Sequence, residues 1–247
     1  MILSGQSSAK CFLKTGTAVR SFSTASQSFI DLRSDTVTRP SQKMFDAMRS
    51  SALGDDGRSD CPTTIKLQKV VADLFGKEAA LLTPSGIMAN NINLKLMAGL
   101  SGESVILGSN SHIINNERGA VSSFAGIMPW IVPNEPDGTM PLDKITRKAS
   151  MAENEHIVPA QGISLESSHN GCNGRVLRPD YVTKVKRIAK RHKAKLHLDG
   201  ARSWNAAVFL DLPMKEMLKE FDLVSVCLSK GLGCPIGSLV VGSEKDI

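Results

Sequence analysis

The first candidate for chemistry in this sequence is Lys230, which directly follows an apolar segment. Residues 223–228 predict a buried β-strand, and Ser229 and Lys230 come at its end. Gly231 and Gly233 then allow the backbone to approach a ligand closely. A lysine that is partly removed from water has a lowered pKa, so its amine can act as a nucleophile toward a carbonyl carbon. The alternative is a surface lysine whose amine extends into solvent.

Other polar or ionisable residues follow the remaining predicted strands. In open α/β sheets ligands bind beyond the carboxyl ends of the strands, so we expect these residues to converge. They are Ser85 and Gly86 after strand 79–83, His112 after strand 104–108, Glu166 to Asn170 after strand 162–165, and Asp199 and Arg202 after strand 195–198. Ser85 and Gly86 begin a predicted helix, and the N–H groups at such a helix start bind phosphate.

This combination of residues is what pyridoxal phosphate (PLP) requires. A lysine forms a Schiff base with the cofactor, a carboxylate keeps the ring nitrogen protonated, and a helix N-terminus holds the phosphate. Lys230, Asp199 and the Ser85–Gly86 turn would fill these roles. Motifs for other chemistry are missing, since the sequence has no GxxxxGK[ST], no GxGxxG between a strand and a helix, no GxSxG and no HExxH.

The elements that must position these residues alternate along the chain. Apolar segments predict strands, and amphipathic or capped segments predict helices between them. The expected strands cover residues 79–83, 104–108, 127–132, 162–166, 195–199, 223–228 and 236–241, and the expected helices include one from Pro62 and one over residues 179–192. This alternation predicts an α/β fold with a mostly parallel sheet and helices on both faces.

Composition excludes several classes of protein. The 247 residues suffice for one large domain, and no run of eighteen apolar residues predicts a membrane-spanning helix. The net charge is +6, but three of these charges lie in residues 1–30, so the rest of the chain carries only +3 and indicates no nucleic-acid partner. The five cysteines show no metal-ligand spacing, so we expect no metal site and a reducing, intracellular compartment.

Residues 1–30 differ from the rest of the chain. They contain ten Ser or Thr residues, three basic residues and no acidic residue. This composition is typical of a mitochondrial transit peptide, and the alternative is a disordered leader on a cytoplasmic protein. The PLP-binding large domain is then expected over residues 31–247.

The chain resembles the low-specificity L-threonine aldolases, which belong to the β-eliminating lyase group of fold-type-I PLP enzymes. The resemblance runs in family order from residue 31 to the last residue. It is carried by Asp31–Pro40, Gly54–Asp56, Phe75–Ala79, Pro84–Gly86, Ser111–His112, Leu196–Arg202 (LHLDGAR), Trp204–Ala206 and Ser225–Gly233 (SVCLSKGLG).

The resemblance implies a role for each cofactor residue. Lys230 would bind PLP covalently, Asp199 would pair with the pyridine nitrogen, and His112 would stack on the ring. Arg202 would lie beside the phenolic oxygen, and Ser85–Gly86 would bind the phosphate. The resemblance therefore assigns to the cofactor site the same main residues that were predicted from the ends of the strands.

The resemblance also implies a substrate site. Ser34 would help to hold the substrate carboxylate, and Arg202 would also contribute to substrate binding. His156 falls at the position of a second family histidine, which together with His112 would lie near the substrate β-hydroxyl. An exposed surface histidine is the alternative for His156.

The implied reaction is cleavage of L-threonine or L-allo-threonine to glycine and acetaldehyde by a homo-oligomer, a dimer or a tetramer. The family chains continue beyond the position of Ile247 with a small domain, so a C-terminally truncated member is expected. One alternative is a catalytically weak or inactive PLP-binding chain that pairs with a longer subunit. The second alternative is another lyase with the same fold.

Overall fold

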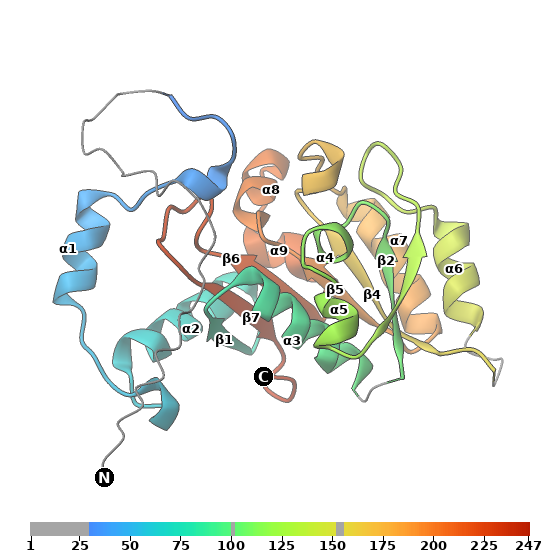
Figure 1. Ribbon diagram of the computed structural model, residues 1–247, viewed down its shortest axis with the longest axis horizontal. Helices are drawn as coiled ribbons and strands as arrows, with labels where there is room; N and C mark the ends of the chain where they lie inside the picture. The colour runs from blue at the N-terminus through green and yellow to red at the C-terminus, as the bar shows by residue number, and fades with distance from the viewer. Residues whose placement is uncertain (1–29, 100–101, 152–155) are drawn as a thin grey trace, which may run out of the picture. The chain divides into compact units, whose positions relative to one another are not determined.

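One mixed β-sheet organises the chain in the computed structural model, which describes residues 30–99, 102–151 and 156–247 (Figure 1). The sheet lies within the compact unit Arg33–Ile247. Its strands, formed by described residues, are β1 (Ala79–Thr83), β2 (Ser104–Gly108), β3 (Met128–Val132), β4 (Ala160–Glu166), β5 (Lys195–Asp199), β6 (Leu223–Cys227) and β7 (Ser238–Gly242). They are ordered β1-β7-β6-β5-β4-β2-β3.

Strand directions bring the carboxyl ends of six strands to one edge of this sheet. β3, β2, β4, β5 and β6 pair in parallel, whereas β7 is antiparallel to both β6 and β1. β1 therefore runs in the same direction as β6. The predicted, mostly parallel sheet is confirmed, and the segments after β1, β2, β4, β5 and β6 all begin at the same edge.

The helices start and end where the sequence signals predicted. Pro62 and Pro179 occupy the first position of their helices, where the missing N–H costs no hydrogen bond. Gly76 ends a helix in the left-handed conformation, with φ of 63°. The described helices are α1 (Gln42–Ser50), α2 (Pro62–Phe75), α3 (Gly86–Ala98), α4 (His112–Asn115), α5 (Ala120–Ser123), α6 (Leu142–Ser150), α7 (Pro179–Arg191), α8 (Ser203–Leu210) and α9 (Met214–Leu218), with 3₁₀ turns at Asp35–Val37, Asp56–Arg58 and Asn170–Cys172.

Apolar side chains fill both sides of the sheet, because successive strand residues point to opposite faces. On β2, Val105 and Leu107 pack in the cluster that contains Leu94 of α3. Ile106, between them, packs in the larger cluster with Val185 of α7. Helices therefore cover both faces, as predicted. No helix in the described part of the chain combines the length and apolarity needed to span a bilayer.

The face of the sheet under α3 carries a row of buried polar groups. His197 Nε2 accepts a hydrogen bond from Asn93 Nδ2 (3.2 Å), and His197 Nδ1 lies 2.9 Å from Ser164 Oγ. Burial lowers the pKa of His197 to about 4, so its imidazole is neutral at pH 7. Asp199, two residues further along β5, points to the same face, where Asn90 of α3 meets it. The alternation of β5 thus aims Asp199 at the start of α3.

The predicted leader cannot be compared with the structure, since residues 1–29 lie outside the described residues and the transit peptide stays a prediction.

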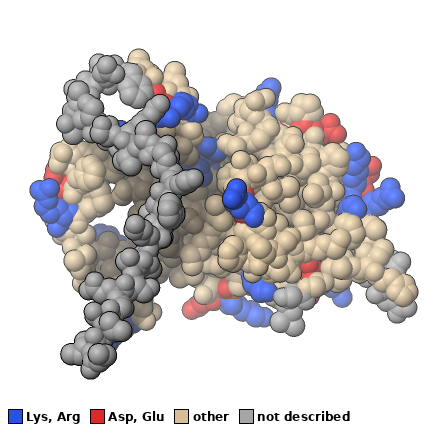
Figure 2. Space-filling view, viewed as in Figure 1, with Lys and Arg blue, Asp and Glu red and all other residues tan. Residues whose placement is uncertain are grey.

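On the face shown in Figure 2, the described Lys and Arg side chains lie scattered among neutral residues rather than in a continuous band.

Candidate active site

A cavity of about 340 Å³ lies at the edge of the sheet where the six strands β1 to β6 end. This volume is within the range of small-molecule sites. Five of the predicted site residues line it together, namely Ser85, Gly86, His112, Asp199 and Lys230. Their further neighbours in the lining include Thr36, Asn90, Glu117, Ala201, Ser225, Cys227 and Ser229. The structure therefore brings together residues that are up to 145 positions apart, from Ser85 to Lys230.

Asp199 is held rigidly at the inner wall of the cavity. Its Oδ2 accepts a hydrogen bond from Asn90 Nδ2 (2.9 Å), and its Oδ1 accepts one from the Ala201 N–H (3.2 Å). Asn90 is itself fixed, because its Oδ1 accepts a hydrogen bond from Ser225 Oγ at 2.5 Å. Asp199 is only 3% exposed. A buried carboxylate without a cationic partner is costly, so this wall favours a ligand that brings a positive charge.

His112 is anchored through both its backbone and its ring. Its N–H donates to Glu166 Oε2 (2.7 Å), and its Nδ1 lies 2.9 Å from Glu117 Oε1. The hydrogen bond to Glu117 raises the pKa of His112 above its usual value, although burial opposes the shift. Burial and the neighbouring Asp199 raise the pKa of Glu166 to about 7. The surroundings of His112 therefore include a carboxyl group, that of Glu166, that can exchange a proton near neutral pH.

Lys230 reaches the cavity from the loop after β6. Its Nζ lies 3.1 Å from Cys227 Sγ, and its backbone carbonyl accepts a hydrogen bond from Thr38 Oγ1 at 2.7 Å. Cys227 is buried and also receives a hydrogen bond from Ser238 Oγ (3.4 Å). The amine is thus directed to the floor of the cavity and does not extend into solvent.

The start of α3 supplies backbone donors. Ser85 caps the helix, since its Oγ accepts a hydrogen bond from the Met88 N–H (3.2 Å). The first N–H groups of a helix have no intrahelical acceptor, and together with the helix dipole they favour an anion. A Cβ added at Gly86 would lie 2.8 Å from Cys227 Sγ. Glycine is therefore required here for the helix start to lie this close to the cavity floor.

Two predicted substrate residues lie next to the cavity rather than in its wall. Arg202 binds both oxygens of Asp35 through Nε (2.9 Å) and Nη2 (2.7 Å), and its Nη1 donates to Asn170 Oδ1 (3.2 Å). Burial alone would raise the pKa of Asp35, but the Arg202 guanidinium keeps it below its usual value. Ser34 Oγ accepts a hydrogen bond from the Thr36 N–H (3.2 Å). In this chain both side chains stabilise the 34–38 segment, whose Thr36 lines the cavity.

The prediction for His156 requires a correction. His156 is exposed and lies four residues before β4, whose first residue is Ala160. The cavity residues follow the other end of β4, and a seven-residue strand spans about 20 Å. Within one chain, His156 therefore lies at the opposite edge of the sheet from His112.

Three polar residues of the site were not predicted to act there. Glu117, Asn90 and Ser225 are each no more than 3% exposed and form one hydrogen-bonded group with His112 and Asp199. A weak signal exists for two of them, since Asn90 lies on the apolar side of its helix and Ser225 interrupts an apolar strand. Glu117 lies in a polar turn between α4 and α5, where the sequence pattern gives no indication of burial.

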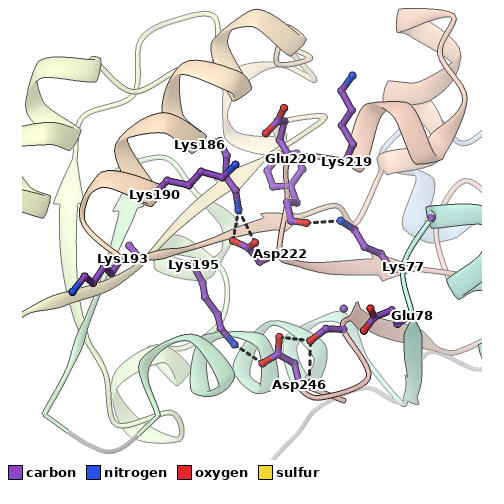
Figure 3. Close-up of a pocket in the computed structure, with 15 residues that line it drawn as sticks. Lys77, Glu78, Lys186, Lys190, Lys193, Lys195, Lys219, Glu220, Asp222 and Asp246 are labelled. Atoms are coloured by element: carbon purple, nitrogen blue, oxygen red, sulfur yellow. Dashed lines mark hydrogen bonds and ion pairs between the residues drawn. The ribbon is translucent and has the colours of Figure 1, made fainter.

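A larger cavity, of about 680 Å³, lies at the opposite edge of the sheet (Figure 3). Six lysines and four acidic residues line it, and two of the lysines form ion pairs with acidic residues of the lining. Lys186 binds both oxygens of Asp222 (2.6 Å), Lys195 binds Asp246, and Lys77 donates to the Phe221 carbonyl. No predicted site residue lines this cavity, so the chemistry belongs to the smaller one.

The comparison with known proteins agrees with this geometry. The sequence model of the family described as "Beta-eliminating lyase" matches residues 31–247. The chain belongs to the β-eliminating lyase family. The resemblance drawn from the motifs is thereby confirmed, and the match covers every residue that lines the cavity.

Two similar relatives are named as low-specificity L-threonine aldolases. The chain is 45% identical over 219 residues to "Low-specificity L-threonine aldolase 1" of Arabidopsis thaliana, a match that covers 88% of this chain and 61% of the relative. It is 41% identical over 218 residues to "Low specificity L-threonine aldolase" of Escherichia coli strain K12, covering 88% and 64%. This chain therefore spans less than two thirds of the length of these relatives.

Solved structures show the same fold. A threonine aldolase from Leishmania major superposes with a TM-score of 0.74 at 21% sequence identity. The superposition covers 86% of this chain and 62% of that one. The expected fold-type-I large domain is thus confirmed.

Proposed function

We propose that this chain is a PLP-dependent lyase that cleaves L-threonine or L-allo-threonine to glycine and acetaldehyde. One observation carries the proposal: Lys230, Asp199 and His112, which come from three separate strand ends, line one cavity. The name shared by its family relatives supports the choice of substrate. The cavity residues support the chemistry independently of those names.

The residues present fit PLP. Because Gly86 has no Cβ, which would lie 2.8 Å from Cys227 Sγ, the start of α3 can lie against the cavity, where its N–H groups can bind a phosphate. Glu117 Oε2 is buried without a hydrogen-bond partner among the described residues, and the nearby Asp199 carboxylate is buried as well. A protonated ring nitrogen beside these carboxylates would satisfy the buried negative charge. The Lys230 amine faces the same space and could bind an aldehyde carbon.

Each residue then has a defined task. Ser85 and Gly86 bind the phosphate, Lys230 attaches the cofactor, and Asp199 keeps a proton on the ring nitrogen. Bound in this way, PLP would supply an electron sink for the bond that breaks between the substrate Cα and Cβ. His112 accepts the β-hydroxyl proton, which must leave as acetaldehyde forms. Its position between Glu117 and the cavity allows it to do so.

The assay that tests this proposal uses the full chain with added PLP. We expect acetaldehyde from L-threonine and L-allo-threonine, measured by coupling to an alcohol dehydrogenase and NADH, and an equal amount of glycine. D-Threonine serves as the control substrate. Binding of PLP without release of acetaldehyde would contradict the aldolase function.

The proposed assembly is a homo-oligomer. Exposed apolar side chains lie beside the cavity at the start of α3 and the end of α5. Their exposed fractions are 40% for Ile87, 48% for Met88 and 85% for Phe124. Grouped apolar side chains at the surface mark contact sites between proteins. A second copy covering this group would also enclose the cavity.

A glycine substitution tests the phosphate site. In Gly86→Ala the new Cβ must displace Cys227 Sγ, which it would approach to 2.8 Å. Overpacking of this kind costs about 1–3 kcal/mol, so we expect PLP affinity to fall by about five- to a hundredfold. Titration of the apoprotein with PLP, followed by absorbance, measures the change.

The double variant Gly86→Ala/Cys227→Ala is the matched control. It removes the sulfur that the new methyl group would meet, so PLP affinity should recover relative to Gly86→Ala. Unchanged affinity in Gly86→Ala itself would show that the cofactor phosphate lies elsewhere.

A further inference from the structure

Glu117 is a buried acid whose contact with His112 has no assigned role in the reaction described above. It is 2% exposed, lies in the turn between α4 and α5, and lines the cavity. Burial of a carboxylate is costly unless its oxygens are hydrogen-bonded. Its Oε1 lies within hydrogen-bonding distance of both His112 Nδ1 (2.9 Å) and Asn90 Nδ2 (2.7 Å). Because burial of this carboxylate is costly, we expect Glu117 to have a function.

The contact with the imidazole decides which ring nitrogen carries the proton. An ionised carboxylate can only accept hydrogen bonds, so His112 Nδ1 must be the donor to Glu117 Oε1. In the neutral ring, the other nitrogen, Nε2, then keeps its lone pair. The side chain of His112 is 31% exposed and borders the cavity, so this lone pair is accessible to a ligand there.

We propose that Glu117 is the positioning residue of His112, fixing the Nδ1–H tautomer so that Nε2 can accept the substrate β-hydroxyl proton. The inference rests on the proposed function for the identity of that proton. The arrangement of an acid, an imidazole and a hydroxyl is the one by which buried carboxylates orient histidine bases in hydrolases. Glu117 acts through His112 and does not contact the reacting atoms.

Glu117 also connects His112 to the carboxylate at the other wall. The Asn90 amide donates to Glu117 Oε1 (2.7 Å) and to Asp199 Oδ2 (2.9 Å). The Asn90 amide nitrogen therefore sets the distance between Glu117, which holds His112, and Asp199, which would face the ring nitrogen of PLP. Loss of Glu117 frees Asn90 as well as His112.

Other charged groups near His112 act on its pKa in the same direction. The largest cause that raises the pKa of His112 is the hydrogen bond to Glu117. Asp199 on β5 and Glu166 on β4 raise this pKa as well, whereas burial lowers it. Glu166 contacts the backbone N–H of His112 and not its ring, so it cannot select the tautomer. Lys230 lines the same cavity from the β6 side.

The tautomer can be measured without catalysis. The full-length apoprotein, labelled with ¹⁵N-histidine and treated with EDTA, has five histidines, and a His112→Gln sample assigns the signal. EDTA is included because ligand atoms of His112, Glu117 and Asp199 lie within 4.8 Å of one another, and a bound cation would also fix the ring. We expect the Nδ1–H tautomer and a pKa above the usual value.

Two substitutions separate charge from hydrogen bonding. Glu117→Gln keeps an acceptor and removes the charge, so the pKa of His112 should fall by about one pH unit. Glu117→Ala removes the acceptor, so both tautomers should appear. Glu117→Asp should restore part of the tautomer preference, and Glu216→Gln, an exposed glutamate on α9, should change neither quantity.

Kinetics add a second readout in the PLP-loaded enzyme. In Glu117→Gln the acid limb of kcat/KM should move to lower pH, and kcat at the plateau should fall by about tenfold or more with little change in KM. An unchanged His112 tautomer in Glu117→Ala and an unchanged pKa in Glu117→Gln would overturn the inference. That result is independent of threonine cleavage, whose absence in the wild-type chain would contradict the proposed function alone.

Discussion

Replacement of Lys230 by alanine is expected to abolish covalent attachment of PLP and to reduce aldol cleavage by more than about a thousandfold. The amine lies on the cavity floor, 3.1 Å from Cys227 Sγ, and no other described lysine lines this cavity. Its removal leaves no nucleophile for the cofactor aldehyde. Reduction of the loaded protein with borohydride, followed by peptide mass analysis, locates the attachment site directly.

Lys184→Ala is the matched control for this substitution. Lys184 lies on the exposed side of α7, with 55% of its side chain accessible, and forms a surface pair with Asp180. Exposed pairs of this kind contribute little to stability, so PLP attachment should be unaffected. A PLP adduct that persists in Lys230→Ala would refute the assignment of this lysine.

Replacement of Asp199 by asparagine is expected to lower kcat by about 10²- to 10³-fold. Asparagine has the same shape but only one acceptor oxygen, so it can keep only one of the two hydrogen bonds that Asp199 accepts at this wall, and the negative charge is lost. Without that charge, the ring nitrogen of PLP would not stay protonated, and the ring would accept electrons less well. Steady-state kinetics, together with the absorbance spectrum of the loaded enzyme, measures both effects.

The control for this charge removal is Asp211→Asn. Asp211 is an exposed residue that ends α8 in the left-handed conformation, with φ of 52°, which asparagine also tolerates. This variant should keep wild-type kcat. If Asp199→Asn retained full activity with PLP bound, the carboxylate would have no part in the electron sink.

Much of the site could be predicted because it depends on strand ends. Lys230, Asp199 and His112 each follow an apolar segment, and the parallel arrangement of β2, β5 and β6 brings these ends to one edge. The rule that ligands bind at this edge then needs no knowledge of tertiary contacts. The same reasoning located the helix start at Ser85.

The other contacts could not be predicted, because they depend on pairs far apart in sequence. The ion pair between Arg202 and Asp35 joins residues 167 positions apart, and the hydrogen bond between Asn90 and Asp199 joins residues 109 positions apart. The family resemblance also placed His156 near His112, whereas the direction of β4 puts them at opposite edges of the sheet within one chain. Burial of Glu117 follows from the path of a short turn, which no periodicity describes.

The contact between Thr38 and Lys230 has a consequence for how the protein matures. These residues are 192 positions apart, yet Thr36 of the same segment forms part of the cavity wall. During synthesis, that wall cannot close until the ribosome has released the stretch around Lys230. Closing so long a loop is entropically costly and slow compared with local folding. Cofactor capture would therefore come only after the region around Lys230 has been made, and it cannot guide the folding of the strands that precede it.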